Sequence, residues 1–314
     1  MTGAPVICFG EALWDRLPGG LFLGGAPVNV AYHLERCGAS AVPVTAVGDD
    51  DLGREMLRRF ARWGLDTRFV GVLGHRPTGV VHAEPLPDGG TSYRIEEDAA
   101  WDWIELSPAL RRTAGACRAV VFGTLAQRFP HNRERLAHLL KCAGGALRVY
   151  DVNLRPPYDS LELVWRLAGR AGLIKANADE LARLTGVAPG AGSLEEGARA
   201  LAEKTACPRV CVTAGAIGAG LLLDRAWHWA EGRPVHVRDT VGAGDAFLAG
   251  LIHGLLDDPG APRQALERAC RLGELVASCE GATPEYTISA AGVPVPATAP
   301  PGEAQRLGDA GEMR

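Results

Sequence analysis

The segment from Asp239 to Phe247, DTVGAGDAF, combines a run of small residues with a carboxylate at the start of an apolar helical pattern. Small residues before a helix let backbone N–H groups converge on an oxyanion, and the helix dipole favours negative charge at the same place. Asp245 falls in the first turn of the expected helix, where it can accept the proton of an alcohol that attacks a bound phosphate. The segment therefore predicts phosphoryl transfer, with Asp245 as general base and an anion hole formed by Gly242, Ala243 and Gly244. An ordinary turn that caps a helix is the alternative.

A second pair of glycines, Gly24 and Gly25, precedes a predicted helix near the N-terminus. Pro27 suits the first position of this helix, and Gly38 suits its C-terminal stop. Asn29 then lies in the first turns, where its amide can donate to a hydroxyl group and accept from it at once. The segment is therefore a candidate for binding hydroxyl groups, with a helix-surface asparagine as the alternative.

Short apolar runs alternate with longer amphipathic segments along most of the chain. The predicted buried strands are 6–9, 41–47, 119–122, 147–150, 173–176 and 209–213. A capping box, with Ser193 at the cap and Glu196 three residues later, is expected to start one of the helices. This alternation predicts a largely parallel sheet covered on both faces, in which ligands bind beyond the carboxyl ends of the strands. The residues expected at those ends are Gly123, Asp151, Asn153, Asn177, Thr213 and Gly215.

Two stretches break this pattern. Residues from about Phe69 to Trp103 alternate as strands, with a turn at 87–90, and predict a β-hairpin layer. The tail from Ala290 to Arg314 is rich in Pro, Ala and Gly and is predicted to be disordered. The remaining residues, 1–289, are expected to form one domain.

Composition excludes several classes of protein. The 314 residues (33.1 kDa) are 47% hydrophobic and 22% charged, with a formal net charge of −4 and no basic cluster, which argues against a nucleic-acid surface. No apolar run approaches membrane-spanning length and no signal peptide is evident, so a cytoplasmic location is expected. The eight cysteines include no C-x-x-C pair, and reduced thiols are expected in place of a zinc site.

The two glycine segments, together with GEALWD at 10–15, resemble in order the N-terminal and C-terminal signatures of the PfkB (ribokinase-like) sugar kinases. The resemblance runs from about Val6 to about Thr283 and includes VGDD at 47–50, FGTL at 122–125, DVNLR at 151–155 and NADE at 177–180. It implies a ribokinase-like three-layer α/β/α fold with a small β-sheet lid, formed by segments of about 12–24 and 69–103. Such a lid closes over the sugar and keeps water from the γ-phosphate.

The resemblance also implies where a sugar binds. Asp15 sits where the family holds sugar hydroxyls with a carboxylate, and Asn29 is similar to the family's sugar-binding asparagine. Arg155 and Arg94 match positions used by fructokinase-like and ketodeoxygluconate kinase members, although a solvated strand residue is an equal alternative for Arg94. The implied substrate-binding residues are Asp15, Gly24, Gly25, Asn29, Arg94, Arg155 and Asp245, with Gln127 and Arg128 as weaker candidates.

For the nucleotide, the implied residues are Asn177, Glu180, Thr213, Gly215, Gly218, Gly242 and Gly244. NADE resembles the family's N-x-x-E motif, so Glu180 is expected to place Mg²⁺ through water, unless it is an ordinary first-turn helix acid. Carbonyls around Asp239 and Val241 would contribute to a potassium site of the kind that family members commonly have. No G-x-x-x-x-G-K-[ST] loop occurs, so the phosphate-binding lysine of that motif is absent.

Within the family, the motifs look most like those of fructokinases, which implies ATP-dependent conversion of fructose to fructose 6-phosphate. A 2-keto-3-deoxygluconate kinase is the nearest rival, and another sugar or nucleoside kinase stays open. A non-catalytic sugar-binding protein on the same scaffold should have lost the base or the cradle, and both are intact. The expected partners are a sugar and ATP, without nucleic acid or membrane, and a homodimer through lid edges is a further expectation.

Overall fold

A nine-stranded sheet forms the centre of the molecule. The computed structural model describes residues 3–17, 19–85, 91–188, 192–289, 292–296 and 306–307. Within these residues the sheet has the order β13-β12-β11-β10-β9-β8-β1-β4-β5. Its strands are β1 Val6–Phe9, β4 Ala41–Gly48, β5 Val70–Leu73, β8 Ala119–Gly123, β9 Leu147–Asp151, β10 Leu173–Asn177, β11 Arg209–Thr213, β12 Gly218–Leu223 and β13 Ala226–Glu231. Seven strands pair in parallel, and the hairpin β12–β13 extends one edge in antiparallel fashion. All six predicted strands are confirmed.

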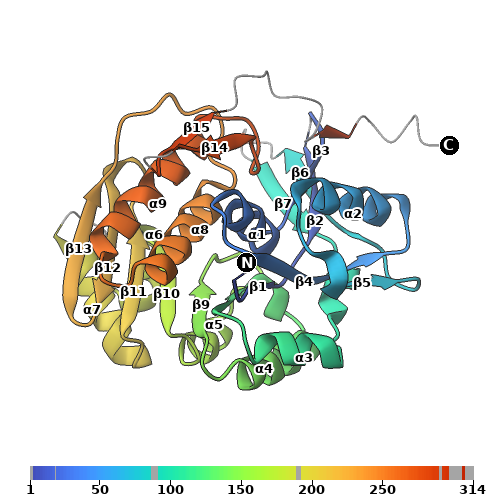
Figure 1. Cartoon of the computed structure of the whole chain (residues 1–314), viewed down its shortest axis with the longest axis horizontal. Helices are drawn as coiled ribbons and strands as arrows, with labels where there is room; N and C mark the ends of the chain where they lie inside the picture. Colours follow the sequence, from blue (N-terminus) through green and yellow to red (C-terminus); the bar gives the residue numbers. More distant parts are fainter. Residues whose placement is uncertain are drawn as a thin grey trace.

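Helices cover both faces of this sheet. One layer holds α1 Ala26–Arg36, α2 Asp51–Trp63, α8 Ala243–Asp257 and α9 Pro262–Ala277, and Figure 1 shows α1, α8 and α9 side by side in front of the strands. The opposite layer holds α3 Pro108–Ala114, α4 Pro130–Cys142, α5 Leu161–Ala168, α6 Ala178–Thr185 and α7 Ser193–Thr205. Short 3-10 segments lie at 67–69, 100–103, 125–127 and 215–217. The predicted three-layer α/β/α fold is confirmed, and none of the helices in the described ranges is both long and apolar enough to cross a bilayer.

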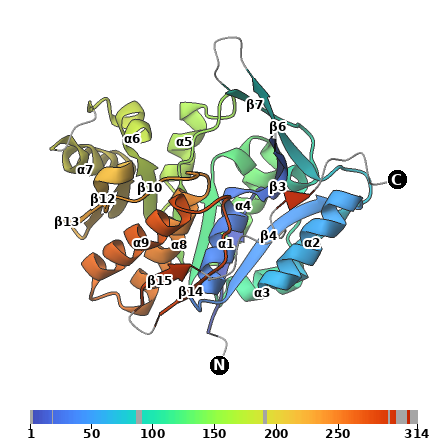
Figure 2. The same ribbon diagram turned by 90° about the horizontal axis from the view of Figure 1, so that it is seen from above.

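A second, smaller sheet is built mainly from the segments in which the lid is expected, and we refer to it as the lid. Its order is β16-β3-β2-β6-β7, built from β2 Leu13–Leu17, β3 Gly20–Gly24, β6 Gly79–Pro85, β7 Thr91–Ile95 and β16 Arg306–Leu307. Figure 2 shows β6 and β7 projecting from the body of the molecule. The turn expected at 87–90 lies outside the described residues. One boundary needs correction, because β5 falls within the expected lid segment 69–103 but pairs with β4 of the central sheet.

Parts of the C-terminal tail depart from the expected disorder. Strand β14, Tyr286–Ile288, pairs with β15, Pro294–Pro296, and β16 pairs with β3 of the lid. The tail therefore contributes strands to two sheets.

The capping box expected at Ser193 is also wrong. Helix α7 begins at Ser193 itself, with Gly192 in the cap position. A capping box forms instead at the start of α6, where Asn177 and Glu180 bond each other's backbone N–H groups.

Candidate active site

The two glycine segments meet above the carboxyl edge of the central sheet. Asn29, in the first turn of α1, donates from Nδ2 to Oδ2 of Asp245 in the first turn of α8, over 2.8 Å. The two residues are 216 positions apart in the sequence. The fold thus joins the predicted hydroxyl-binding amide to the predicted base.

Backbone donors at the start of α8 are available for an anion. Gly242 caps the helix in the left-handed conformation, with φ of 76°, and a Cβ there would collide with Ala282. The N–H of Ala243 approaches the carbonyl of Thr240 at 3.3 Å, whereas those of Gly244 and Asp245 have no acceptor within the described residues. Free N–H groups at the N-terminus of a long helix suit an anionic ligand.

The surroundings of Asp245 shift its pKa. Burial raises its pKa to about 6, and the negative charge of Asp151 adds to this effect. The hydrogen bond from Asn29 and the charges of Lys175 and Arg155 act in the opposite direction. A carboxylate with a pKa near 6 is ionised at neutral pH and is still a useful base.

Lys175 lies directly beneath this cradle, although neither signature includes it. It stands opposite Asp151 in the register of β9 and β10, and its Nζ lies 3.0 and 3.2 Å from the two Asp151 oxygens. A Cβ on Gly244 would lie 3.3 Å from Nζ. The sequence signal was a single lysine in the apolar strand LIKAN, two residues before the NADE motif.

Glu11 is a second buried ionisable group, and its position in the sequence predicts no role for it. Its side chain is buried, and its Oε2 has no hydrogen-bond partner among the described residues. Burial raises its pKa to about 7; backbone hydrogen bonds and Arg155 lower it, whereas Asp245 raises it further. We refer to Glu11, Asp15, Asp151 and Asp245 as the carboxylate cluster.

Asp15 extends the carboxylate cluster onto the lid. It lies on β2, opposite the neighbouring strand that ends in Gly24, and a Cβ at Gly24 would collide with its carboxylate. A Cβ at Gly25 would collide with the carbonyl of Glu11. Burial raises the pKa of Asp15 to about 6, and the positive charge of Arg155 opposes this. The exposed Arg155 thus lies near enough to act on Asp15, Glu11 and Asp245 together.

Glu180 is engaged by the backbone through both carboxylate oxygens. Oε2 accepts from the N–H of Asn177 at 2.9 Å, and Oε1 accepts from the N–H of Leu154 at 2.8 Å. Glu180 therefore fixes the start of α6 and the loop that carries Arg155. No group of three or more His, Cys, Asp or Glu side chains arranged to hold a metal occurs in the parts of the chain that the structure describes.

Asp239 ties the cradle to the segment after α9. Its Oδ1 accepts from the N–H of Val241 at 3.0 Å, and its Oδ2 accepts from the N–H of Gly281 at 3.1 Å. On the other side, Thr213 ends β11, and Gly215 and Gly218 bound the short turn that leads into β12. Large apolar side chains are exposed at Ile217 in this turn and at Val235, Val237 and Val241 in the loop between β13 and α8.

Comparison with a known family fits this geometry. Residues 19–288 match the pfkB family carbohydrate kinases. The chain belongs to this family. This kinase is 28% identical over 305 residues to a fructokinase of Klebsiella pneumoniae, covering 87% of this chain and 93% of the relative. It is also 29% identical over 272 residues to an aminoimidazole riboside kinase of Salmonella typhimurium, covering 82% and 83%.

Solved structures of relatives have the same fold. A fructokinase from Vibrio cholerae O395, in a form with bound fructose, ADP and calcium ion, superposes with a TM-score of 0.76 at 25% identity, covering 90% of this kinase and 96% of that chain. An aminoimidazole riboside kinase from Salmonella enterica, complexed with aminoimidazole riboside and an ATP analogue, gives 0.74 at 26% identity, covering 89% and 95%. The ribokinase-like architecture of this kinase is thereby established.

One expected sugar contact does not fit the lid of this kinase. Residues paired across neighbouring strands share a face of the sheet, and successive residues alternate between faces. Asp15 pairs with Val81, which pairs with Ile95, whereas Arg94 pairs with His82. Arg94 therefore lies on the face opposite to Asp15, and we leave it out of the sugar site.

The weaker sugar candidates, Arg128 and Gln127, differ in whether their polar atoms have partners. Arg128 is buried, binds both oxygens of Asp102 at 2.7 and 2.6 Å, and stacks on Trp101 with 4.1 Å to the ring centre. These contacts give it a structural task. Gln127 is also buried, but neither of its amide atoms has a partner in the described part of the chain.

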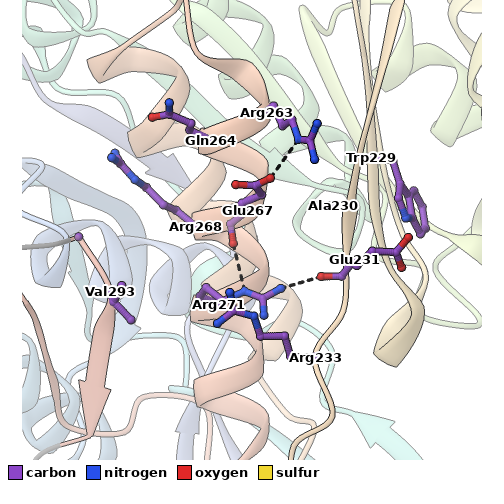
Figure 3. A pocket seen from close by; sticks show the side chains of 11 residues that line it. Trp229, Ala230, Glu231, Arg233, Arg263, Gln264, Glu267, Arg268, Arg271 and Val293 are labelled. Atoms are coloured by element: carbon purple, nitrogen blue, oxygen red, sulfur yellow. Dashed lines mark hydrogen bonds and ion pairs between the residues drawn. The ribbon is translucent and has the colours of Figure 1, made fainter.

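A cavity of this kinase lies away from the carboxylate cluster. It measures about 470 Å³ and lies between β13 and α9, as Figure 3 shows. Its charged lining residues are Arg233, Arg263, Arg268, Arg271, Glu231 and Glu267. We call it the arginine groove. None of the predicted sugar or nucleotide residues lines it.

Proposed function

We propose that this kinase transfers the γ-phosphoryl group of ATP to a hydroxyl group of fructose and forms fructose 6-phosphate. The observation that carries the proposal is the meeting of Asn29 with Asp245 beside the free N–H groups of the cradle. A hydroxyl that binds beside these two side chains would lie next to both a proton acceptor and an anion site. Such an arrangement serves phosphoryl transfer, which depends on positioning and on charge stabilisation.

The proposed reaction follows from these groups. Asp245 takes the proton of the sugar hydroxyl as its oxygen attacks the γ-phosphorus, the bond between the β–γ bridging oxygen and the γ-phosphorus breaks, and ADP leaves. The N–H groups of the Gly242 to Gly244 cradle would stabilise the charge on the transferred group. After ADP leaves, Asp245 releases this proton to solvent and returns to its ionised form.

Fructose is proposed as the sugar because of the relatives and the residues near Asp15. The Vibrio cholerae fructokinase binds fructose, and the Klebsiella pneumoniae relative is a fructokinase. In this chain Asp15, Asn29 and Arg155 provide a carboxylate, an amide and a guanidinium around one site, while Gly24 and Gly25 leave room for it. The riboside kinase relatives make aminoimidazole riboside a competitor that an assay must include.

ATP with Mg²⁺ is the proposed phosphoryl donor. The exposed apolar residues Ile217, Val235 and Val237 support an adenine site beside the Thr213 to Gly218 turn. Glu180 suits magnesium through water, because each of its oxygens already accepts one backbone N–H and keeps a second lone pair. A bound Mg²⁺ would neutralise phosphate charge.

A potassium site is proposed at the backbone carbonyls around Asp239 and Val241. The side chain of Asp239 is not among the proposed ligands, because both of its oxygens already accept hydrogen bonds from backbone N–H groups.

The test is ADP release from ATP and Mg²⁺ over a panel of possible acceptors: fructose, ribose, glucose, 2-keto-3-deoxygluconate, aminoimidazole riboside and adenosine. Selective turnover of fructose that disappears in Asp245→Asn would establish the reaction and its base. Preference for another acceptor would replace the substrate. Failure to turn over any member would revive a non-catalytic sugar-binding protein.

A further inference from the structure

Lys175 is the buried cation that the two signatures leave out. It lies on β10 in the middle of the central sheet, and only 6% of it is exposed. Side chains alternate along a strand, so Lys175 shares the face of Leu173, which belongs to the core beneath α1, α8 and α9. This direction brings the ammonium group under the N-terminus of α8, next to Gly244.

The surroundings keep Lys175 charged. Burial alone would lower the pKa of a lysine, but the negative charges of Asp151, Glu180 and Asp245 raise it above its ordinary value. Asp151 lies directly opposite and holds the ammonium through both oxygens. An ammonium has three N–H donors, and Asp151 is the only acceptor of Lys175 within the described residues. At least one donor is therefore free for a ligand.

A purely structural role explains this arrangement poorly. A buried ion pair adds little stability, because removing two charges from water costs about as much as their attraction returns. The position of the pair is more informative, since Lys175 is the cation that lies against the proposed anion hole. Kinases with a phosphate-binding loop supply a lysine from that loop, and this chain has no such loop.

We propose that Lys175 is a catalytic cation of this kinase, which binds the γ-phosphoryl group from beneath the Gly242 to Gly244 cradle, and that Asp151 positions it. This inference rests on the proposed function. The ammonium would move little between free and bound states, since Asp151 holds it in place. Its charge would stabilise the transferred phosphoryl group where the backbone donors also point.

The decisive variants are Lys175→Met and the double variant Lys175→Met with Asp151→Asn. The single variant leaves a buried carboxylate unpaired and should lose stability for that reason alone. The double variant removes both charges and should fold. Lys204→Met is a matched control, because Lys204 is one of only three lysines in the chain and stacks on Trp165 at 3.8 Å. Thermal unfolding of each variant reports on folding.

In turnover assays, both Lys175 variants should lose at least about a hundredfold in kcat, while the KM for the sugar changes little and Lys204→Met stays at wild-type activity. Recovery of activity in the double variant would overturn the proposal, because Lys175 would then serve only to neutralise Asp151.

The pH profile of turnover gives a second criterion. The charged groups that face Asp245 are Glu11 after β1, Asp151 on β9, Arg155 in the loop after β9, and Lys175. If Lys175 only lowered the pKa of Asp245, then Lys175→Met would regain wild-type activity at high pH, which would also overturn the proposal.

Nucleotide binding separates this inference from the proposed function. Calorimetry should show that Lys175→Met with Asp151→Asn weakens binding of a non-hydrolysable ATP analogue by more than about tenfold, while ADP binding changes much less. This selective loss would support the role of Lys175 even if no acceptor in the panel were phosphorylated. Equal effects on the analogue and on ADP would contradict it, even if fructose proved to be the substrate.

Discussion

The carboxylate cluster and the arginine groove both contain several charged side chains, but these side chains differ in their partners and in their burial. In the groove, Arg263 pairs with Glu267 at 3.0 Å and Arg271 pairs with Glu274 at 2.9 Å, each within one turn of α9. In the cluster, the buried Glu11 has a carboxylate oxygen without a hydrogen-bond partner among the described residues, and the amide oxygen of the neighbouring Asn29 also has none there. Groups that are buried and incompletely bonded carry a free-energy cost, whereas an exposed pair such as Arg263 with Glu267 is nearly neutral. The two regions thus differ in the groups that they offer, because the carboxylate cluster presents buried oxygen acceptors and the arginine groove presents mainly guanidinium groups.

The largest expected effect in this comparison comes from Asp245→Asn. The amide keeps the shape of the side chain but cannot take a proton, so kcat should fall by at least about a hundredfold while sugar and ATP still bind. Steady-state kinetics and calorimetry on the same preparation measure both quantities. Near-normal turnover would remove Asp245 from the role of base.

The pH dependence of kcat/KM should show the raised pKa of the buried Asp245. Its pKa is raised to about 6, and a base must be ionised to act, so the rate should rise with pH up to about 6 and level off above it. Below that value, each pH unit should cost about tenfold. A profile that is flat from pH 5 to pH 8 would show that a different group limits the reaction.

Asp15→Ala tests the lid side of the cluster, with Arg94→Ala as its matched control from the opposite face of the same sheet. Loss of a hydrogen-bonding carboxylate should raise the KM for the sugar by about tenfold or more and leave the KM for ATP nearly unchanged. Arg94→Ala should change either constant by less than about twofold. If the two variants behaved alike, the assignment of faces from the strand register would be wrong.

The smallest effect is expected in the arginine groove. Arg233 and Arg268 are exposed, and neither guanidinium has a protein partner in the described ranges, so replacing either with Ala should leave kcat unchanged. The free energy of unfolding should change by no more than about 0.5 kcal/mol. Kinetics and denaturant titration of the two variants check this, and a clear loss of activity would connect the groove to catalysis.

The sequence predicted those features that depend on local pattern. Buried parallel strands are continuous apolar runs, so strands such as Val6–Phe9 and Arg209–Thr213 could be located from the local sequence alone. The motif at Asn177 and Glu180 was harder, because a metal motif and a capping box have the same spacing. The structure shows the capping box, and the metal role stays a proposal.

Features that depend on pairing between distant strands could not be predicted in this way. The alternation around Arg94 indicated a strand, but the face that it presents is decided by register with strands far away in the sequence. Lys175 was missed for a related reason. Its partner Asp151 lies 24 positions earlier, and its nearness to Gly244 exists only after α8 has packed onto the sheet.

Strand β16 gives the C-terminal residues an influence on the opposite end of the sequence. Arg306 and Leu307 pair with Phe22 and Leu21 on β3, the strand next to the one that bears Asp15. Proteolytic trimming before Arg306 would therefore leave Asp245 and Lys175 untouched but would bare a backbone edge on the lid. An unpaired strand edge is a template for a second molecule. The length of the tail thus affects how these molecules associate. A preparation in which the C-termini differ in length should contain molecules that associate to different extents.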